Sequence, residues 1–374
     1  MSHGVERPLR VLHAPTMIAG IPQSLAAAER ALGLDSHSAA FFRTPYGYEA
    51  DEIVLEGPGG RLRQERRRWR FLLEVARRFD VVHFNAGETI MPQYSDRAAS
   101  ALHRRVFDAY ARTFELRDAA WLRRLGKAVF VSFLGGEARI HEFGRKRFEI
   151  SYTHEVAGTT SDERKARRVA TFDRWANGIY SIHPDLMWTL PSRAQFLPHP
   201  GVDLSDWRPV STERRDRPLI VHAPSDRRIK GTRFVEAALD QLRADGVAFD
   251  YELVEGMTRT DARKIYERAD LLVEQLLLGW YSNLAIELMA LGKPVVTYVR
   301  DEDLRFVPEE MRRDLPVINA TPDSISSVLR TWLTDRRDEL PEVGRASRAY
   351  VERWHDPLRI AARTKADYER ALAR

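Results

Sequence analysis

The chain has 374 residues, 44% of them hydrophobic and 30% charged, a balance typical of a globular protein with about two domains. It contains no cysteine, which excludes disulfides, thiolate zinc sites and a cysteine nucleophile. The formal net charge of +5 is small for this length, so nucleic acid is not an expected partner.

Short apolar runs alternate with longer amphipathic stretches in the first half of the chain. Strands are predicted at residues 9–13, 81–84, 128–133 and 179–182. A helix at residues 21–32 follows the first strand through a loop that contains Gly20, and the charged residues 141–170 are typical of a long surface helix with loops. This alternation predicts a parallel sheet covered by helices on both faces.

One basic cluster interrupts this pattern, with six arginines between Arg61 and Arg70. It is typical of a solvated helix face. It also fits a peripheral contact with anionic lipid headgroups, in which Trp69 would lie at the membrane interface. Residues 1–15 contain no apolar run that could begin a secretory signal. We therefore expect a cytoplasmic protein, with peripheral contact at the inner membrane face as an open alternative.

The alternation starts again after residues 207–218, a polar stretch with two prolines that is typical of a linker. Strands are predicted at residues 219–223, 249–254, 271–274 and 294–299, and a helical pattern broken at Pro357 ends the chain. We predict domains at 1–208 and 218–350, followed by a helical segment at 351–374. Because ligands bind beyond the carboxyl ends of parallel strands, the expected site is the cleft between the domains.

Residues 269–296 combine a buried strand, a loop with a glycine, a helix and another strand. Ser282 is a candidate N-cap, so the backbone N–H groups of Asn283 and Leu284 would face the cleft and could bind a diphosphate. Glu287 lies just over one turn further on, where its carboxylate could accept hydrogen bonds from a ribose. An ordinary crossover with a solvated glutamate would show the same pattern.

A second candidate site element follows the predicted strand at residues 219–223. Its loop carries Arg227, Arg228 and Lys230, and opens a helix. Arginine can bind a diphosphate through two parallel N–H donors, and lysine binds it as a compact positive charge. The alternative is ordinary surface charge. Both elements would meet at the same edge of the predicted second sheet.

These residues resemble glycosyltransferase family 4, a large family of retaining enzymes with the GT-B fold. Lys230-Gly231 matches the end of the family's basic loop, and residues 287–296 match the second half of its Glu-x7-Glu motif and the strand that follows. Residues 197–203 resemble its interdomain segment, residues 131–139 its strand-loop element in the first domain, and residues 350–356 its closing helix.

The resemblance implies an α/β fold of two Rossmann-like domains that face a central cleft, with the acceptor in the first domain, the donor in the second, and the last helix crossing back. The reaction would transfer a sugar from a UDP or GDP sugar, with retention, to a glycan, lipid-linked or small-molecule acceptor. Arg227 and Lys230 would stabilise the leaving diphosphate, and Gly20 would let the backbone approach it from the first domain. No metal or other cofactor is implied.

Two positions depart from the family pattern. Gly279 stands where the first glutamate of Glu-x7-Glu falls, and Leu134 stands where the family's loop histidine falls. His83, at a predicted strand end, is a candidate to supply a polar group instead, and the alternative is a structural histidine. Gly135 and Glu137 are further candidates on the acceptor side. The departures leave open a non-catalytic protein that binds a nucleotide sugar or a glycan on the same scaffold. A basic module recruited to membrane or RNA is a third possibility.

Residues 301–303 formally fit an Asp-x-Asp metal motif. That motif belongs to a different glycosyltransferase fold, and here it lies in a charged loop after a predicted strand. We therefore expect no metal at these residues.

Overall fold

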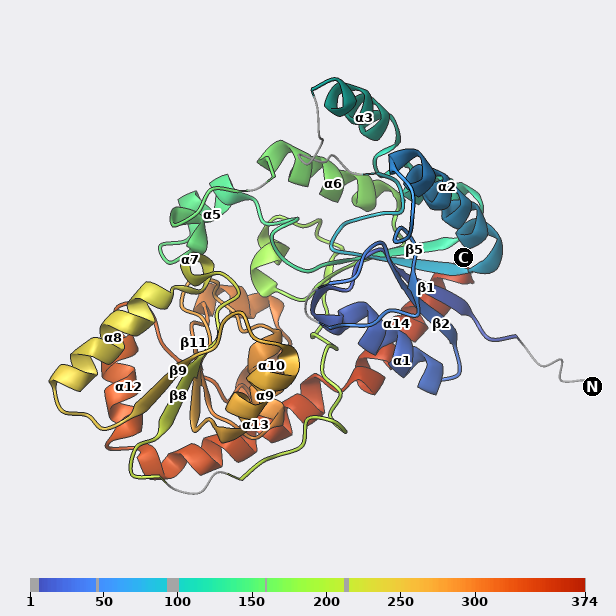
Figure 1. The fold of residues 1–374 in the computed structure, drawn as a ribbon. Coiled ribbons are helices and arrows are strands. Elements are labelled where there is room, and N and C mark those ends of the chain that lie inside the picture. The colour runs from blue at the N-terminus through green and yellow to red at the C-terminus, as the bar shows by residue number, and fades with distance from the viewer. Residues whose placement is uncertain (1–6, 45–46, 93–100, 159, 212–214, 374) are drawn as a thin grey trace, which may run out of the picture.

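A computed structural model describes residues 7–44, 47–92, 101–158, 160–211 and 215–373. These residues form two α/β lobes, each built around one parallel sheet, as the sequence predicts (Figure 1).

The sheet of the first lobe has seven parallel strands in the order β3-β2-β1-β4-β5-β6-β7. The strands are β1 (Arg10–Ala14), β2 (Asp35–Ala40), β3 (Glu52–Ile53), β4 (Val81–Asn85), β5 (Ala128–Phe133), β6 (Gly178–Ser181) and β7 (Gln195–Phe196). Its helices are α1 (Ile21–Ala31), α2 (Arg61–Arg78), α3 (Ala101–Phe114), α4 (Arg117–Arg124), α5 (His141–Arg147) and α6 (Asp162–Trp175). The chain order reverses between β1 and β4, which is where ligands bind in such sheets.

The sheet of the second lobe has five parallel strands in the order β12-β11-β10-β8-β9. The strands are β8 (Leu219–His222), β9 (Asp250–Leu253), β10 (Leu271–Val273), β11 (Val295–Thr297) and β12 (Ile318–Asn319). Its helices are α7 (Arg227–Lys230), α8 (Thr232–Ala244), α9 (Arg259–Arg268), α10 (Asn283–Ala290), α11 (Glu309–Arg313), α12 (Ile325–Leu333) and α13 (Leu340–Trp354). Here the order reverses between β8 and β10, so the loops after these two strands flank the expected ligand position.

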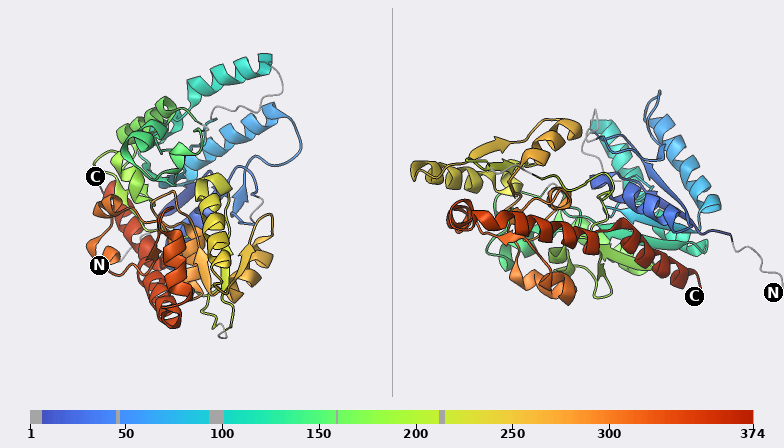
Figure 2. Two further views of the ribbon diagram at one scale, coloured as in Figure 1. Left: turned by 90° about the vertical axis from the view of Figure 1, so that its left-hand side faces the viewer. Right: turned by 90° about the horizontal axis from the view of Figure 1, so that it is seen from below.

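The last helix, α14 (Pro357–Leu372), belongs to the core of the first lobe. It begins with proline at the first helical position, which proline tolerates well, and Asp356 caps it. Ile360, Ala361 and Tyr368 are buried against residues of α1 and of the first sheet. Figure 2 shows α13 and α14, in red, running across both lobes.

The charged segment 141–170, expected as a long surface helix with loops, contains two shorter helices and a 3₁₀ turn. Helix α5 ends before Phe148, a 3₁₀ turn covers Tyr152–His154, and Ser161 caps the start of α6 by accepting a hydrogen bond from the Arg164 N–H. The segment is broken because its middle contacts the second lobe, where the Tyr152 N–H donates to the Leu277 carbonyl at 3.0 Å. Across the described ranges, no helix has both the length and the apolar character needed to cross a membrane.

Candidate functional site

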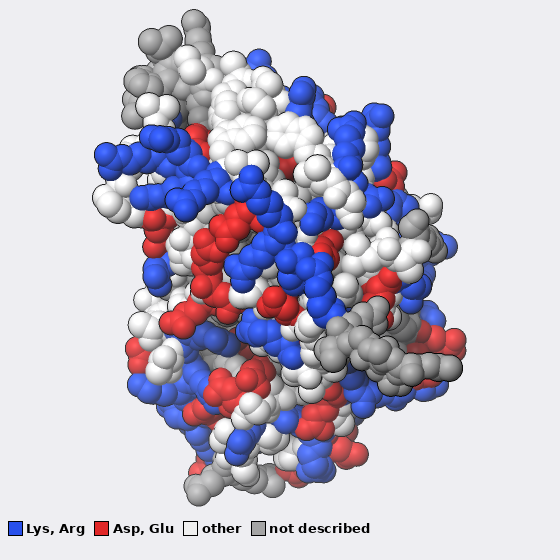
Figure 3. Space-filling model, turned by 90° about the vertical axis from the view of Figure 1, so that its right-hand side faces the viewer, with Lys and Arg blue, Asp and Glu red and all other residues white. Residues whose placement is uncertain are grey.

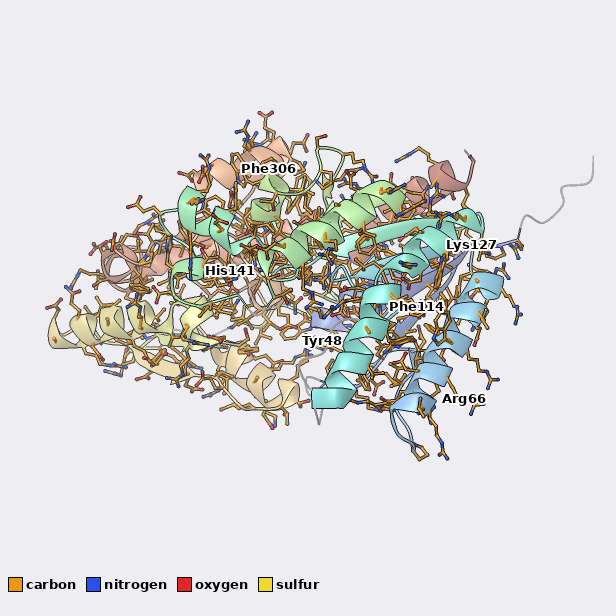
Figure 4. The ribbon with its side chains drawn as sticks, turned by 90° about the horizontal axis from the view of Figure 1, so that it is seen from above. Tyr48, Arg66, Phe114, Lys127, His141 and Phe306 are labelled. Atoms are coloured by element: carbon orange, nitrogen blue, oxygen red, sulfur yellow. The ribbon has the colours of Figure 1, made fainter. Side chains whose placement is uncertain are left out.

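Loops from the carboxyl edges of the two sheets face each other. The Arg300 guanidinium, after β11, donates to the Ile150 carbonyl at 2.7 Å, and the Trp188 indole donates to the Asp303 carboxylate at 2.7 Å. Residues of both lobes, among them Tyr152, Leu277 and Arg300, line a small pocket here. Figure 4, from above, shows α5 and the labelled His141 and Phe306 near this contact and Tyr48 between the lobes.

The start of α10 offers hydrogen-bond donors that no described residue of the protein uses. Ser282 occupies the N-cap position, but its hydroxyl makes no capping bond. Within the described part of the chain, no acceptor bonds the N–H groups of Asn283 and Leu284, and both residues are partly exposed. Unpaired N–H groups and the positive end of the helix dipole form a favourable position for an anion.

Lys230 lies beside this helix start, within a cage of acceptors. Its ammonium donates to the Glu274 carboxylate at 2.9 Å, to the Ser282 hydroxyl at 3.1 Å and to the side-chain oxygen of Gln275. The Ser282 hydroxyl and the Thr297 hydroxyl also donate to Glu274. Both charged groups are buried, so the pair fixes a positive charge next to the free N–H groups of α10.

The arginines of the same loop point elsewhere, which corrects the expectation that Arg227 or Arg228 joins Lys230. Arg227 forms ion pairs with Glu255, at 2.5 Å, and with Glu236. The side chain of Arg228 is 70% exposed beside Asp226. The physical reason is that α7 is a single helical turn, on which successive side chains point about 100° apart.

The place of Glu287 just over one turn inside the helix suggests a partly exposed side chain. In the structure Glu287 is instead buried inside the second lobe. One of its oxygens accepts from Arg259 at 3.1 Å and from the Asn283 amide at 3.1 Å. Burial raises the pKa of Glu287, and the positive charge of Arg259 opposes that change. The side-chain oxygen of Asn283 is buried and has no partner among the described residues, so this corner of the site retains an unused acceptor.

The first lobe covers Gly20 with an aromatic ring. Gly20 has a φ of +69° and caps α1, and a Cβ atom built there would lie 2.9 Å from the ring of Tyr48. Across the lobes, the Arg259 guanidinium lies 5.2 Å from the centre of the same ring. Tyr48 therefore bridges the Gly20 loop and the helix that carries Arg259, and a phosphate approaching Gly20 must displace this ring.

His83 lies in the core, which corrects its assignment to the acceptor side. One ring nitrogen is 2.6 Å from the Tyr368 hydroxyl and the other is 2.8 Å from the Ser132 hydroxyl. Burial and the neighbouring His13 hold the pKa of the His83 imidazole well below its usual value. The prediction ended the strand at residue 84, but β4 continues to Asn85, so His83 is an interior strand residue.

The loop after β5 is closed by its own carboxylate. The N–H groups of Leu134 and Gly135 both donate to Glu137, the latter at 3.0 Å. Leu134 packs with Ile21, Ala86 and other buried apolar residues that follow the strands of the first sheet. The first lobe therefore presents an apolar floor at this edge where the family resemblance expects a histidine.

A histidine that the sequence analysis did not single out faces the second lobe. His183 follows β6 and is partly buried, and its imidazole has no hydrogen-bond partner in the described ranges. Burial, with the positive charges of Arg139 and Lys230, lowers the pKa of His183 to about 4, so the ring is neutral near pH 7. In the segment between the lobes, burial, with the neighbouring His355 and His183, holds the pKa of His199 well below its usual value.

Arg300 occupies the space beside Gly279. Gly279 has a φ of +78°, and a Cβ atom there would lie 2.6 Å from a guanidinium nitrogen of Arg300. Arg300 pairs with the buried Asp303 at 2.7 Å, and its guanidinium lies 3.7 Å from the centre of the Phe148 ring. A cation therefore lies where the family resemblance expects a glutamate.

Glu302 and Asp303, within the acidic residues 301–303, are used in ion pairs and interlobe contacts. Glu302 pairs with Arg147, and burial raises the pKa of Asp303 to about 6 against the effect of Arg300. In the part of the chain that the structure describes, no group of three or more His, Asp or Glu side chains is arranged to hold a metal ion.

The basic cluster lies on the first half of α2. Arg61, Arg63, Arg66 and Arg70 are exposed, and the face of the first lobe in Figure 3 carries a broad band of Lys and Arg side chains. Trp69, however, is partly buried, and its indole donates to the Tyr110 hydroxyl at 2.7 Å. Trp69 therefore packs within the first lobe, and its place at a membrane interface stays a prediction.

Solved structures share this architecture, whereas no protein-family model and no curated protein matches the sequence. Sucrose-phosphate synthase from Thermosynechococcus elongatus is 16% identical, with a TM-score of 0.60 over 98% of this chain and 100% of that chain. HepE from Anabaena, in complex with UDP-glucose, is 10% identical, with a TM-score of 0.59 over 95% of this chain and 98% of that chain. The catalytic domain of starch synthase IV from Arabidopsis thaliana, bound to ADP and acarbose, is 11% identical, with a TM-score of 0.57 over 98% of this chain and 100% of that chain.

At these identities the likeness concerns the fold. The chain has the GT-B architecture of two Rossmann-like lobes.

Proposed function

We propose that this protein is a glycosyltransferase that takes its sugar from a nucleoside diphosphate donor. The observation that carries the proposal is the start of α10, where the free N–H groups of Asn283 and Leu284 lie beside the Lys230–Glu274 pair. Glu287 and the unused acceptor of Asn283 lie within the next turn. The site thus offers donors for a diphosphate and acceptors for sugar hydroxyls. Similar structures were solved with UDP-glucose and with UDP, which supports a nucleotide ligand.

The same residues suit the transfer step. When the bond between the sugar and the diphosphate breaks, negative charge develops on the leaving phosphate oxygen. Fixed N–H dipoles and the ammonium of Lys230 would stabilise that charge without a divalent ion. We therefore propose a metal-independent reaction, with retention at the anomeric carbon as the family resemblance implies.

The first lobe would bind the acceptor. His183, with its free neutral imidazole, is the group that we assign to an acceptor or sugar hydroxyl, in place of His83. The apolar floor around Leu134 fits the less polar part of an acceptor. The acceptor class, whether glycan, lipid-linked or small molecule, is the open part of the proposal.

The site has one feature that favours binding without transfer. Arg300 fills the space beside Gly279, where the family places a donor-sugar ligand. A protein that binds a nucleotide sugar without turning it over would tolerate that change. Nucleotide binding is common to both functions, so turnover is the measurement that separates them.

The test has two stages. A thermal-shift screen with UDP, GDP and ADP should show one nucleoside diphosphate that raises the melting temperature, because a ligand selective for the folded state stabilises it. The corresponding nucleotide sugars are then followed by NMR for release of the nucleoside diphosphate and for the configuration of the product. Stabilisation by none of the nucleotides would refute the proposal, and stabilisation without turnover of any sugar would favour the binding protein.

We also propose that the exposed arginines of α2 make a peripheral contact with anionic membrane surfaces. Leu62, at 84% exposure, lies among them and supplies an apolar contact. Vesicles that contain phosphatidylglycerol should cosediment the wild-type chain, and Arg63→Glu with Arg66→Glu should abolish this. Equal binding of the double variant, or equal binding to neutral phosphatidylcholine vesicles, would refute the contact and leave a solvated helix face.

A further inference from the structure

A second hollow lies at the opposite edge of the second sheet. It has a volume of about 670 Å³ and is lined by Pro209–Ser211, Arg215 and Pro218 before β8, by the turn before β11 and by the first turns of α13. These residues precede the strands of the sheet, whereas the candidate site follows the carboxyl ends of the same strands. The hollow is thus separated from the α10 site by the length of the sheet.

A buried cation lines this hollow. Lys293 is 2% exposed, and its buried ammonium nitrogen has no hydrogen-bond partner among the residues that the structure describes. Burial lowers the pKa of Lys293 to about 8, while the charges of Asp270 and Glu267 oppose that change. Leaving a buried ammonium group unpaired is costly, so its retention needs a compensating anion.

Two arginines add to this positive charge. Arg215 and Arg345 both line the hollow, and the guanidinium of neither has a hydrogen-bond or ion-pair partner in the described ranges. The charge of Arg215 reaches Lys293 and contributes to lowering its pKa. The carboxylates of Asp270 and Asp338 also line the hollow, and one oxygen of Asp270 accepts from the Leu219 N–H at 2.8 Å.

One side of helix α13 closes the hollow. Leu340, Pro341, Gly344 and Arg345, from the first turns of this 15-residue helix, line the cavity. A Cβ atom on Gly344 would clash with the carbonyl oxygen of Gly292, so the helix rests directly on the turn that carries Lys293. Arg345 and Lys293 therefore lie on two segments that pack against each other at the wall of the hollow.

We propose that this hollow is a binding site for a phosphate group, either inorganic phosphate or the phosphomonoester of a small phosphorylated sugar. A dianion would pair with Lys293 and with the guanidinium groups of Arg215 and Arg345, for which phosphate geometry is well matched. The occupant would contact the linker and α13, which are the two segments that lead from the second lobe to the first. This proposal is independent of the proposed function, because it involves a different edge of the sheet.

The test is calorimetric titration of the full chain with inorganic phosphate, and in parallel with glucose 6-phosphate, in a chloride-containing HEPES buffer of constant ionic strength. Arg345→Gln should weaken binding at least tenfold, and Lys293→Met should abolish it. Arg312→Gln is the matched control, since Arg312 is an exposed arginine on α11 outside the hollow, and it should bind as the wild type does. Tighter binding of one probe identifies the source of the phosphate.

Two results would overturn the proposal. One is equal phosphate affinity in the wild type, in Arg345→Gln and in Arg215→Gln. These two variants keep the test valid if Lys293→Met fails to fold. The other is phosphate binding that survives these changes but disappears in Lys230→Met, which would place the anion at the start of α10.

Discussion

Replacing Lys230 by methionine separates its role in folding from its role in binding. The substitution keeps the length of the side chain and removes the ammonium that pairs with Glu274 at 2.9 Å. Glu274 is 1% exposed, so it would be left as a buried carboxylate that accepts from the Ser282 hydroxyl, the Ser282 N–H and the Thr297 hydroxyl. Removing one partner of a buried ion pair costs about 3–5 kcal/mol, and we expect about 3 kcal/mol here because the hydroxyl bonds remain.

A second substitution should restore the stability. Glu274→Gln in the Lys230→Met background keeps the shape of the side chain and removes the unpaired charge. Neutral replacements for a buried pair often leave stability nearly unchanged, so the double variant should lie within about 1 kcal/mol of the wild type. Urea unfolding of both variants measures this. Lys264→Met is the control, because that exposed lysine pairs with Asp261 at the surface and should cost under about 1 kcal/mol.

Nucleotide affinity should follow a different order. A charge-assisted hydrogen bond contributes about 1.5–3 kcal/mol, which corresponds to roughly a tenfold to hundredfold change in Kd. The single variant should bind the nucleoside diphosphate most weakly, because it adds the repulsion of Glu274 to the loss of Lys230. The double variant should remain about tenfold weaker than the wild type despite its recovered stability. A double variant that binds as tightly as the wild type would remove Lys230 from the binding site, and an undiminished stability of the single variant would refute the buried pair.

The remaining predictions concern other parts of the molecule. Glu287→Gln should weaken nucleotide binding in calorimetry by about tenfold and, because it unpairs Arg259, should lower the unfolding free energy by about 1 kcal/mol; unchanged affinity would show that Glu287 is structural. Sugar transfer should survive EDTA, and loss of activity that manganese or magnesium restores would contradict a metal-independent site. Gly279→Ala should destabilise the protein in urea unfolding by more than about 1 kcal/mol, since its φ is positive and Arg300 fills the space; wild-type stability would contradict this packing. The folded pKa of Lys293 is about 8, below that of an unfolded lysine, so the unfolded chain binds more protons between pH 8 and about 10.4. The unfolding free energy of the wild type should therefore rise over this range by up to about 3 kcal/mol relative to that of Lys293→Met. Unfolding free energies of the two proteins that change in parallel with pH would show that Lys293 is not buried as a charge.

Strands with continuous apolar runs could be predicted from the sequence alone. Residues 128–133 form β5 with the predicted bounds, because a strand buried on both faces needs apolar side chains at every position. By contrast, β2 reads Asp-Ser-His-Ser-Ala-Ala and gives no such signal. It is buried because the Ser36 hydroxyl donates to Glu29 and the Ser38 hydroxyl donates to Asp51. Those partners lie on other elements, and only the tertiary structure brings them together.

The residues of the candidate site, like the strands, could be predicted only in part from the sequence. The sequence identified Ser282 and Lys230 as members of two motifs, and the structure brings their side chains to 3.1 Å. It did not identify Arg259, which reaches Glu287 from a helix 28 residues away, because no local spacing links them. Arg227 was predicted to face the ligand, but Glu255 on the neighbouring strand end holds it outward. Local patterns indicate which loops carry chemistry, whereas the direction of each side chain depends on charges elsewhere in the fold.

The loop between β10 and α10 links the donor site to the contact between the lobes. Its Leu277 carbonyl accepts from Tyr152 of the first lobe, and its Gly279 carbonyl accepts from the Arg300 N–H at 3.0 Å. The Arg300 side chain in turn donates to the Ile150 carbonyl, again in the first lobe. Any rotation of one lobe against the other must therefore break or carry along bonds that lie within a few residues of Ser282. The free N–H groups at the start of α10 are thus positioned by both lobes, although every residue of that helix belongs to the second.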